Sequence, residues 1–301
     1  MLTIDEIGAA RARIGDVVRP LTVAPFAPRV SLALEFLQFS GSFKARGAAN
    51  FVLAHAERGT LPDSGIAIAS GGNAGLAFVW AARLANTKAT VFVPATTPDA
   101  KLDRLTTLGA IVHRVGTEYG EAAEACANFG RDNDVLLAHA YADPLMAAGA
   151  GTLVDEIVAH QPGVDTVVVS VGGGGLFAGV ATAAAAHGIR TVGVEPRTCR
   201  ALNAAIEAGR PVDVEVDSIA MDSLGARRAT DLALQAAQAS DTRSILVDDR
   251  EIADARDLLW DEHRIGVEYG AAAALAAIRG PYVPGSGERA CVVLCGANIR
   301  K

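Results

Sequence analysis

The sequence predicts an α/β protein made of two open, twisted lobes, each with a mostly parallel sheet. Short apolar segments of strand length alternate with segments of helix length along most of the 301 residues. This alternation is typical of parallel strands joined by crossover helices. Glycine-rich turns follow two of the apolar segments, at 70–73 and 172–175. A chain of this length can bury a large core, so two lobes are possible.

The first forty-odd residues contain one expected helix and then extended segments. The helix covers 4–14, and prolines punctuate the part that follows it. Residues 29–36 are rich in apolar side chains and predict a buried strand. A second helix, which carries Arg46 and Asn50, follows Lys44.

A regular pattern of strands and helices begins at residue 66. Pro98 occupies the favoured first turn of one helix, and Gly109 ends that helix. The expected strands are 66–69, 89–93, 111–115 and 135–138, and the expected helices among them are 74–84, 98–108 and 118–131.

The pattern resumes after Asp143-Pro144. Residues 166–171 form a β-branched run, as expected of a central strand covered on both faces. Asp248, with Glu251 three residues later, resembles a capping box at the start of a helix. The other expected helices are 145–159, one from the 172–175 turn to His187, and 271–278, and the other expected strands are 191–195, 244–247 and 290–295.

The boundary between the lobes is expected near Asp143-Pro144. We expect residues 1–44 to return to the second lobe, which gives a large domain of 1–44 and 144–301 and a small domain of 45–143. No repeat of fixed period and no long linker interrupts this organisation.

Composition narrows the class of protein. Half of the residues are apolar and a fifth are charged, as in an ordinary globular enzyme. The net charge of −7 gives no basic surface for nucleic acid and does not favour an anionic membrane. The N-terminus is charged at once and has no apolar signal core. The cysteines form no CxxC pair, so we expect free thiols, a reducing compartment and a cytoplasmic enzyme.

Lys44 is the first candidate catalytic residue. The small residues of Ser40-Gly41-Ser42 precede it and let the backbone approach a ligand closely. Phe43 can pack on a flat ring. A lysine that loses solvation in such a place falls in pKa and becomes a nucleophile able to form a Schiff base. The alternative is a solvated lysine at the start of an alanine-rich helix.

The Gly172–Gly175 turn lies between a strand and a helix. Its backbone N–H groups and the helix N-terminus can hold a phosphate. No Gly-Lys-Ser/Thr follows, so it is not a Walker loop. Gly173, Gly175 and Ala178 also satisfy the dinucleotide pattern, with Glu195 near the ribose-binding acidic position. A nicotinamide-dependent oxidoreductase is therefore an alternative, and a plain tight turn is another.

Four further sites have both a functional and a structural interpretation. The Ser70–Asn73 turn can bind a carboxylate at a helix start, although Asn73 can also be a simple helix cap. Cys295 ends the last strand and can meet a ring nitrogen or be a small buried apolar residue. Glu195 and Glu268 lie at strand or helix ends, where surface charges are also common.

Taken together, these segments resemble the fold-type II family of pyridoxal-phosphate enzymes, in its serine/threonine dehydratase group. The resemblance runs over 35–298. Residues 35–48 are similar to the family's segment around its Schiff-base lysine, Gly71–Asn73 to its Ser/Ala-Gly-Asn loop, and Val171–Leu176 to its phosphate loop. The resemblance implies a tryptophan synthase β-like architecture with the cofactor in the cleft between the lobes.

Two further segments, around Glu195 and Glu268, are also similar to family segments. Residues 73–77 and 294–296 look most like the cysteine-ended L-serine dehydratases, since the threonine dehydratases and serine racemases usually have serine at the position of Cys295. The family's usual proline after the late glutamate is Tyr269 here.

The resemblance implies a role for each matching residue. Lys44 would hold pyridoxal phosphate and then remove the substrate Cα proton. The residues that would contact the cofactor are Phe43, Asn73, Gly172, Gly173, Gly174, Gly175, Leu176 and Cys295. Ser70, Gly71 and Asn73 would bind the substrate carboxylate. The implied reaction is β-elimination of L-serine or L-threonine to pyruvate or 2-oxobutanoate and ammonia.

Departures from the family pattern refine these expectations. Family racemases place a serine at the position of Gly71, so we expect little racemase activity. The family's cation site would comprise Glu195, Cys199 and Ala201, which suits potassium better than magnesium. The resemblance also implies a homodimer. The alternatives are a threonine synthase, a β-replacing synthase or a racemase of the same fold, the oxidoreductase, and a catalytically silent binding protein.

Overall fold

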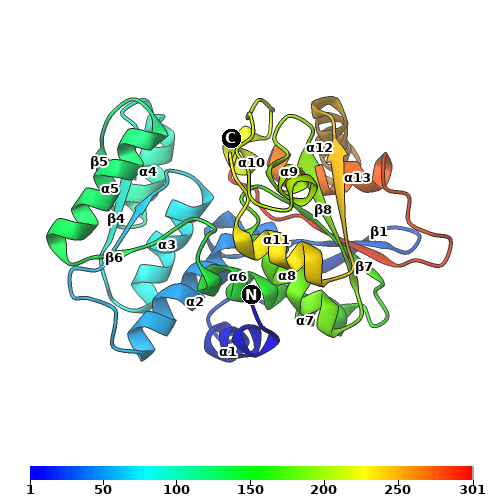
Figure 1. Cartoon of the computed structure of the whole chain (residues 1–301), viewed down its shortest axis with the longest axis horizontal. Coiled ribbons are helices and arrows are strands. Elements are labelled where there is room, and N and C mark those ends of the chain that lie inside the picture. The colour runs from blue at the N-terminus through cyan, green and yellow to red at the C-terminus, as the bar shows by residue number, and fades with distance from the viewer. Residues whose placement is uncertain (300–301) are drawn as a thin grey trace.

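The computed structural model describes residues 1–299 and contains two sheets, each in its own lobe (Figure 1). The smaller sheet has the order β5-β4-β3-β6, and all of its neighbouring strands are parallel. Its strands are β3 (Ile66–Ala69), β4 (Ala89–Val93), β5 (Ile111–Arg114) and β6 (Leu136–Leu137). The predicted strand 135–138 is therefore confirmed in part, because only its central residues pair with β3.

The larger sheet has the order β1-β2-β10-β7-β8-β9. Only the β1–β2 pair is antiparallel. The strands of this larger sheet are β1 (Val23–Ala27), β2 (Val30–Ala33), β7 (Thr166–Ser170), β8 (Arg190–Pro196), β9 (Thr242–Val247) and β10 (Ala290–Val293). The α/β class with mostly parallel sheets is confirmed. The bounds of the two domains remain a prediction, although β1 and β2 do join the sheet of the later residues.

The helices lie between the strands in chain order. They are α1 (Ile4–Ile14), α2 (Lys44–Glu57), α3 (Asn73–Leu84), α4 (Asp99–Thr107), α5 (Tyr119–Asn133), α6 (Pro144–Gly151), α7 (Leu153–His160), α8 (Gly175–Ala186), α9 (Ala201–Ala208), α10 (Met221–Leu224), α11 (Asp231–Ala239), α12 (Asp249–His263) and α13 (Tyr269–Arg279). The predicted capping box of Asp248 and Glu251 is present at the start of α12. No helix within residues 1–299 is both long and apolar enough to span a bilayer.

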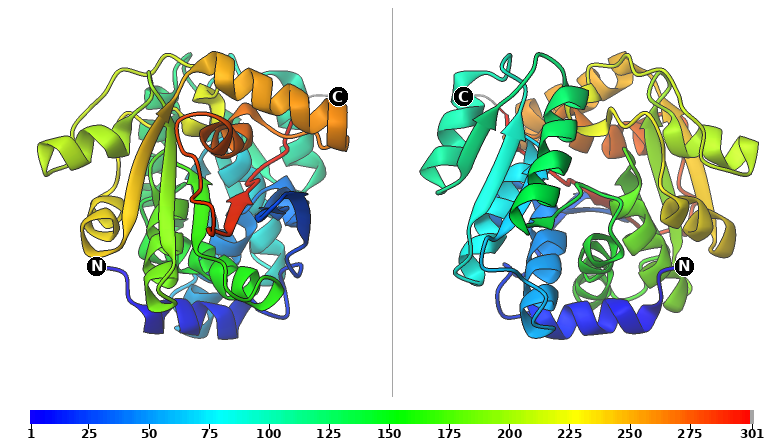
Figure 2. Two further views of the ribbon diagram at one scale, coloured as in Figure 1. Left: turned by 90° about the vertical axis from the view of Figure 1, so that its right-hand side faces the viewer. Right: turned by 60° about the vertical axis from the view of Figure 1, so that its left-hand side comes forward.

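Helix α2 lies at the junction of the two lobes. It packs against α3 on one side and α6 on the other. Helix α1 runs below both lobes (Figure 2), with Ile7 in the core of the large lobe and Ile14 packed near Ala49 of α2. Lys44 is the first residue of α2, so the candidate catalytic lysine lies where the two lobes meet.

Several predicted elements end earlier than expected. The strand predicted over 29–36 stops at Ala33, and Glu35–Leu37 form a short 3₁₀ turn. The strand predicted over 290–295 stops at Val293, which leaves Cys295 just beyond its carboxyl end. The helix predicted over 145–159 is divided at Thr152, whose hydroxyl donates to the carbonyl of Gly149 at 2.7 Å. Such a bond competes with the regular helical pattern.

The analysis of the sequence assigns no element to residues 196–243, where the structure contains α9, α10 and α11. These helices are short, at four to nine residues. Helix α11 has a visible start signal, because the Thr230 hydroxyl accepts a bond from the N–H of Ala233 at 3.1 Å.

Candidate active site

The backbone just before Lys44 is hydrogen-bonded to the residues that follow β10. The N–H of Phe43 donates to the carbonyl of Cys295 at 2.9 Å. Ser42 and Gly296 form an isolated antiparallel bridge. Residues that are about 250 positions apart in the sequence therefore lie side by side, and the thiol of Cys295 is placed close to the start of α2.

The amine of Lys44 is held by the segment that follows β6. Its Nζ donates to the carbonyl of Ala140 at 2.7 Å. It lies 4.9 Å from the ring centroid of Phe43 and 5.9 Å from that of Tyr141. Burial lowers the pKa of Lys44 to about 8, against a smaller opposing effect of Cys295 and Glu268. A substantial fraction of this amine is therefore neutral and nucleophilic near neutral pH.

The glycine loop, residues 172–175, lies between β7 and α8. Gly174 has a φ of +96°, which favours glycine. A Cβ on Gly173 would lie only 2.2 Å from the ring of Tyr141. These positions require glycine, and the loop leads into the N-terminus of α8, whose backbone N–H groups can stabilise an anion.

The Ser70–Asn73 loop lies between β3 and α3, and its asparagine reaches the other lobe. Asn73 Nδ2 donates to both carboxylate oxygens of Glu268, at 2.8 and 3.1 Å. Asn73 Oδ1 accepts from the side chain of Asn298, and the N–H of Asn298 donates to Glu268 at 2.7 Å. Glu268 therefore positions Asn73, which gives a role to an acid that the sequence left uncertain.

The ionisation of two groups in the site is set by burial. The thiol of Cys295 is buried, and desolvation raises its pKa to about 12. It therefore stays protonated at neutral pH. Burial also raises the pKa of Glu268, against the opposing effect of its bonds from Asn73 and Asn298.

Comparison with known proteins decides the family. A profile of pyridoxal-phosphate dependent enzymes matches residues 20–296.

The chain belongs to this family.

Relatives with assigned activities include an L-threonine ammonia-lyase of Thermotoga maritima, which is 30% identical over 310 residues, 99% of this chain and 76% of that protein. A serine dehydratase-like protein of Homo sapiens is 33% identical over 285 residues, 89% of this chain and 85% of that protein. The solved structure of maize serine racemase superposes with a TM-score of 0.92 at 26% identity, covering 99% of this chain and 94% of that one. These similarities favour a pyridoxal-phosphate enzyme over the nicotinamide-dependent alternative.

The residues present suit the cofactor of the family. Lys44 provides an amine of lowered pKa, and the glycine loop leads into the N-terminus of α8, where no side chain forms a capping hydrogen bond. Asn73 provides a side-chain amide, held in place by Glu268, of a kind that can bond a ring hydroxyl. Cys295 provides a neutral thiol.

The structure brings the predicted cofactor-binding residues together near Lys44, with Tyr141 lying beside both Lys44 and the glycine loop. Ser42 and Phe43 contact the Cys295–Gly296 segment, and Gly296 lies against Asn73 and Glu268. Four residues near Lys44 were not predicted from the sequence: Ala140, Tyr141, Asn298 and Arg104, whose guanidinium donates to the side chain of Asn298. The position of Asn298 in the sequence could have indicated a role in the site, because it follows closely after Cys295 at the carboxyl end of a parallel strand.

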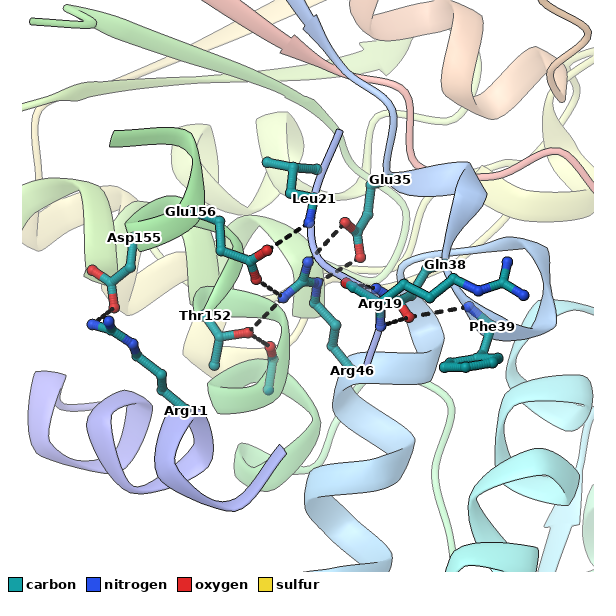
Figure 3. A network of polar contacts seen from close by, with 11 residues as sticks. Arg11, Arg19, Leu21, Glu35, Gln38, Phe39, Arg46, Thr152, Asp155 and Glu156 are labelled. Carbon is teal, nitrogen blue, oxygen red and sulfur yellow. Dashed lines mark hydrogen bonds and ion pairs between the residues drawn. The ribbon is translucent and has the colours of Figure 1, made fainter. Parts of the chain in front are cut away.

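A buried ion-pair network fixes the first turn of α2 (Figure 3). Arg46 Nε and Nη2 donate to the two carboxylate oxygens of Glu35, at 2.6 and 3.1 Å. Arg46 Nη1 donates to Glu156 and, at 3.2 Å, to the hydroxyl of Thr152. The side chains of Arg46 and Glu35 are each 1% exposed. This network joins α2 to α7 two residues after Lys44.

The predicted cation-site residues lie apart from this group, at the start of α9. Both carboxylate oxygens of Glu195 accept backbone N–H groups, from Leu202 at 2.7 Å and Asn203 at 2.8 Å. Burial raises the pKa of Glu195 to about 7. Within residues 1–299 no group of three or more His, Cys, Asp or Glu side chains is arranged to hold a metal ion. Cation binding by Glu195, Cys199 and Ala201 remains a prediction.

Proposed function

We propose that this chain catalyses the β-elimination of L-serine and L-threonine, which are converted to pyruvate or 2-oxobutanoate and ammonia. The observation that carries the proposal is the position of Lys44. A partly neutral amine lies in the same region as the glycine loop, the Ser70–Asn73 loop and a neutral thiol. The first loop would bind the phosphate of the cofactor and the second the carboxylate of the substrate. The ammonia-lyase and dehydratase names of the relatives agree with this chemistry.

Each residue would hold a defined part of the cofactor or substrate. The N–H groups of Gly172–Gly175 and Leu176 would bind the phosphate of the cofactor, and Phe43 would pack on its ring. Asn73 would bond the ring hydroxyl, and Cys295 would meet the ring nitrogen. When bound, pyridoxal phosphate supplies an electron sink for the bond broken at the substrate Cα.

Lys44 moves the proton in this scheme. Lys44 would hold the cofactor in the resting protein, and its Nζ, once free, would accept the Cα proton of the substrate. The carbonyl of Ala140, 2.7 Å from Nζ in the structure, would hold the freed amine in place. Only the neutral amine can accept the proton, and a pKa of about 8 keeps enough of it available for catalysis.

Cys295 favours elimination over reactions that store charge on the cofactor ring. A thiol with a pKa near 12 can share a hydrogen bond with the ring nitrogen, but it carries no negative charge that would hold the nitrogen protonated. The ring is then a weaker electron sink than it would be beside a carboxylate. Rapid loss of the β-hydroxyl suits such a ring, because little charge has to build up on it.

Gly71 argues against racemisation. The Ser70–Asn73 loop would bind the substrate carboxylate through Ser70, Gly71 and Asn73. A racemase needs a proton donor on the face of the substrate opposite Lys44, and glycine has no side chain to provide one. A serine racemase is among the structural relatives, but the residue needed for that activity is missing from this loop position.

The finer features of the proposal follow from the family resemblance and, for the location, from the free cysteines and the charged N-terminus. Potassium at Glu195, Cys199 and Ala201, a homodimer and a cytoplasmic location are all predictions. Addition of potassium to a sample exchanged into sodium buffer tests the first, and sedimentation of the purified chain tests the second.

Product analysis tests the proposed reaction. The purified protein, supplied with pyridoxal phosphate, should convert L-serine and L-threonine to equal amounts of 2-oxo acid and ammonia. Lys44→Ala should abolish this activity. Lys88→Ala is the matched control, because Lys88 is exposed, and should keep it. A wild-type protein that produces neither 2-oxo acid, or that produces chiefly D-serine, would contradict the proposal.

A further inference from the structure

Tyr141 borders the candidate site but is not among the residues predicted from the sequence. Its ring lies against Gly173, where an added Cβ would be 2.2 Å from two of the ring carbons. Its carbonyl lies 2.8 Å from the Cβ position of Gly175. The ring centroid is also 5.9 Å from Lys44 Nζ. Tyr141 therefore borders both the reactive amine and the glycine loop.

The segment that carries Tyr141 has a fixed shape. His139 Nδ1 accepts the N–H of Tyr141 at 3.3 Å and that of Ala142 at 3.1 Å. The two rings meet edge to face, with centroids 4.7 Å apart. Asp143 then caps α6 by accepting the N–H of Leu145 at 2.7 Å. A ring held from both ends of a short turn can act as a rigid boundary.

The substituents of the substrate Cα show what this boundary faces. The Cα hydrogen must point to Lys44 Nζ, and the carboxylate is assigned to the Ser70–Asn73 loop by the proposed function. That loop contacts residues 296–298, on the side of Lys44 formed by Asn73 and Glu268. Tyr141 borders Lys44 from a different segment, the one that follows β6, with its ring centroid 5.9 Å from Nζ. A substrate side chain on that side of Lys44 would lie against this ring.

We propose that Tyr141 is a specificity-determining residue, whose ring limits the substituent on the β-carbon and selects L-serine over L-threonine. The substrate class is thus a small amino acid with a β-hydroxyl and no β-methyl group. This inference rests on the proposed function for the placement of the carboxylate. The bulk of the ring, and not its hydroxyl, makes the selection.

A cavity beyond the ring makes the proposal testable. It has a volume of about 580 Å³ and is lined in part by His139, Tyr141, Arg228 and Thr230. Thr230 adjoins the glycine loop, since its N–H donates to the carbonyl of Gly173 at 3.0 Å. Truncation of Tyr141 would join this cavity to the space beside Lys44, so that a β-methyl group gains room.

The test compares Tyr141→Ala with Tyr141→Phe in the cofactor-loaded protein. One methyl group in an apolar pocket changes kcat/KM by roughly 10–200-fold. Tyr141→Ala should therefore lower the serine-to-threonine ratio of kcat/KM by about tenfold or more. Tyr141→Phe retains the ring and should leave the ratio within about twofold. Tyr141→Leu, which fills part of the space, should fall between them and serves if the alanine variant does not fold.

A second readout does not depend on elimination. L-Alanine and L-2-aminobutanoate differ by one methyl group and have no hydroxyl to lose. Titration of the visible absorption of the bound cofactor gives a dissociation constant for each. The wild type should bind L-alanine more tightly, and Tyr141→Ala should reduce that preference by about the same factor as it changes the kinetic ratio.

The outcomes separate this inference from the proposed function. If the wild type makes no 2-oxo acid but Tyr141→Ala still changes the ratio of dissociation constants, the proposed reaction is wrong and the role of Tyr141 is supported. If Tyr141→Ala leaves that ratio unchanged, the role of Tyr141 is refuted whatever the activity. A change of the ratio as large in Tyr141→Phe as in Tyr141→Ala would also refute it, because the hydroxyl would then make the selection.

Discussion

Replacement of Arg46 by methionine is a direct test of how the first turn of α2 is held. Arg46 bonds Glu35 through two nitrogens and Glu156 and Thr152 through a third, and Arg46 and Glu35 are almost completely buried. Methionine keeps the unbranched aliphatic stem of Arg46 but leaves the carboxylate of Glu35 buried without its cation. An uncompensated buried charge is strongly destabilising.

The expected loss is about 3–5 kcal/mol of the free energy of unfolding, the range for removal of one partner from a buried ion pair. For a chain of this size that corresponds to a fall in Tm of roughly 6–10 °C. The loss also depends on pH. Burial already raises the pKa of Glu35, and loss of the guanidinium raises it further. Below its pKa the carboxyl is neutral in the folded variant, so the loss is smaller at acidic pH and grows as pH rises through the folded pKa.

Thermal unfolding followed by circular dichroism at two pH values measures both effects. Arg11→Met is the matched control, since Arg11 pairs with Asp155 at 3.2 Å in the same region but is 66% exposed. A surface pair of this kind contributes about 0–1 kcal/mol. Adding Glu35→Leu to Arg46→Met should recover a large part of the loss, because it removes the unpaired charge. An Arg46→Met protein no less stable than Arg11→Met, or a double variant worse than the single, would refute this reasoning.

Three further predictions concern the reacting groups. The rate at which cofactor-free protein binds pyridoxal phosphate should rise with pH and level off above about 8, as Lys44 loses its proton, and stopped-flow absorbance measures it; a rate that is flat across this range would contradict the lowered pKa. Cys295→Ala should retain the visible absorption of bound cofactor but lower kcat for L-serine by about 10-fold or more, as expected on loss of a group that assists in the transition state. An unchanged kcat would show that the thiol has no part in the mechanism. Gly71→Ser should gain racemisation of L-serine, measured by chiral chromatography, whereas Gly71→Ala should not, because only serine adds a proton donor; the new Cβ would lie 3.1 Å from Val93, so a small shift of that side chain is needed.

The parts of the site that the sequence predicts are those with strong local constraints. Gly173 is a glycine because the ring of Tyr141 leaves no room for a Cβ, and Gly174 is a glycine because its φ is positive. These requirements appear in the sequence as a run of glycines. Lys44 is recognisable because the small residues before it and the helix after it lie within one short segment. Strand and helix alternation likewise predicts the two parallel sheets, since each element has its own apolar pattern.

The missed parts depend on contacts between distant segments. Tyr141 meets Gly173 from a turn whose sequence shows only polar and small residues, and no local pattern indicates where that turn lies in space. Asn298 and Asn73 are 225 residues apart but bond across the two lobes. The kink at Thr152 depends on a side-chain bond that competes with the helix, which a search for periodic apolar residues does not detect.

The most direct test of the account is to identify the lysine that carries the cofactor. The chain has only four lysines, Lys44, Lys88, Lys101 and Lys301. Protein saturated with pyridoxal phosphate would be reduced with borohydride, digested and mapped by mass spectrometry. The account predicts the added mass on the peptide containing Lys44, with loss of the visible absorption in Lys44→Ala. A cofactor found on another lysine, or no stable adduct at all, would contradict the central role of Lys44.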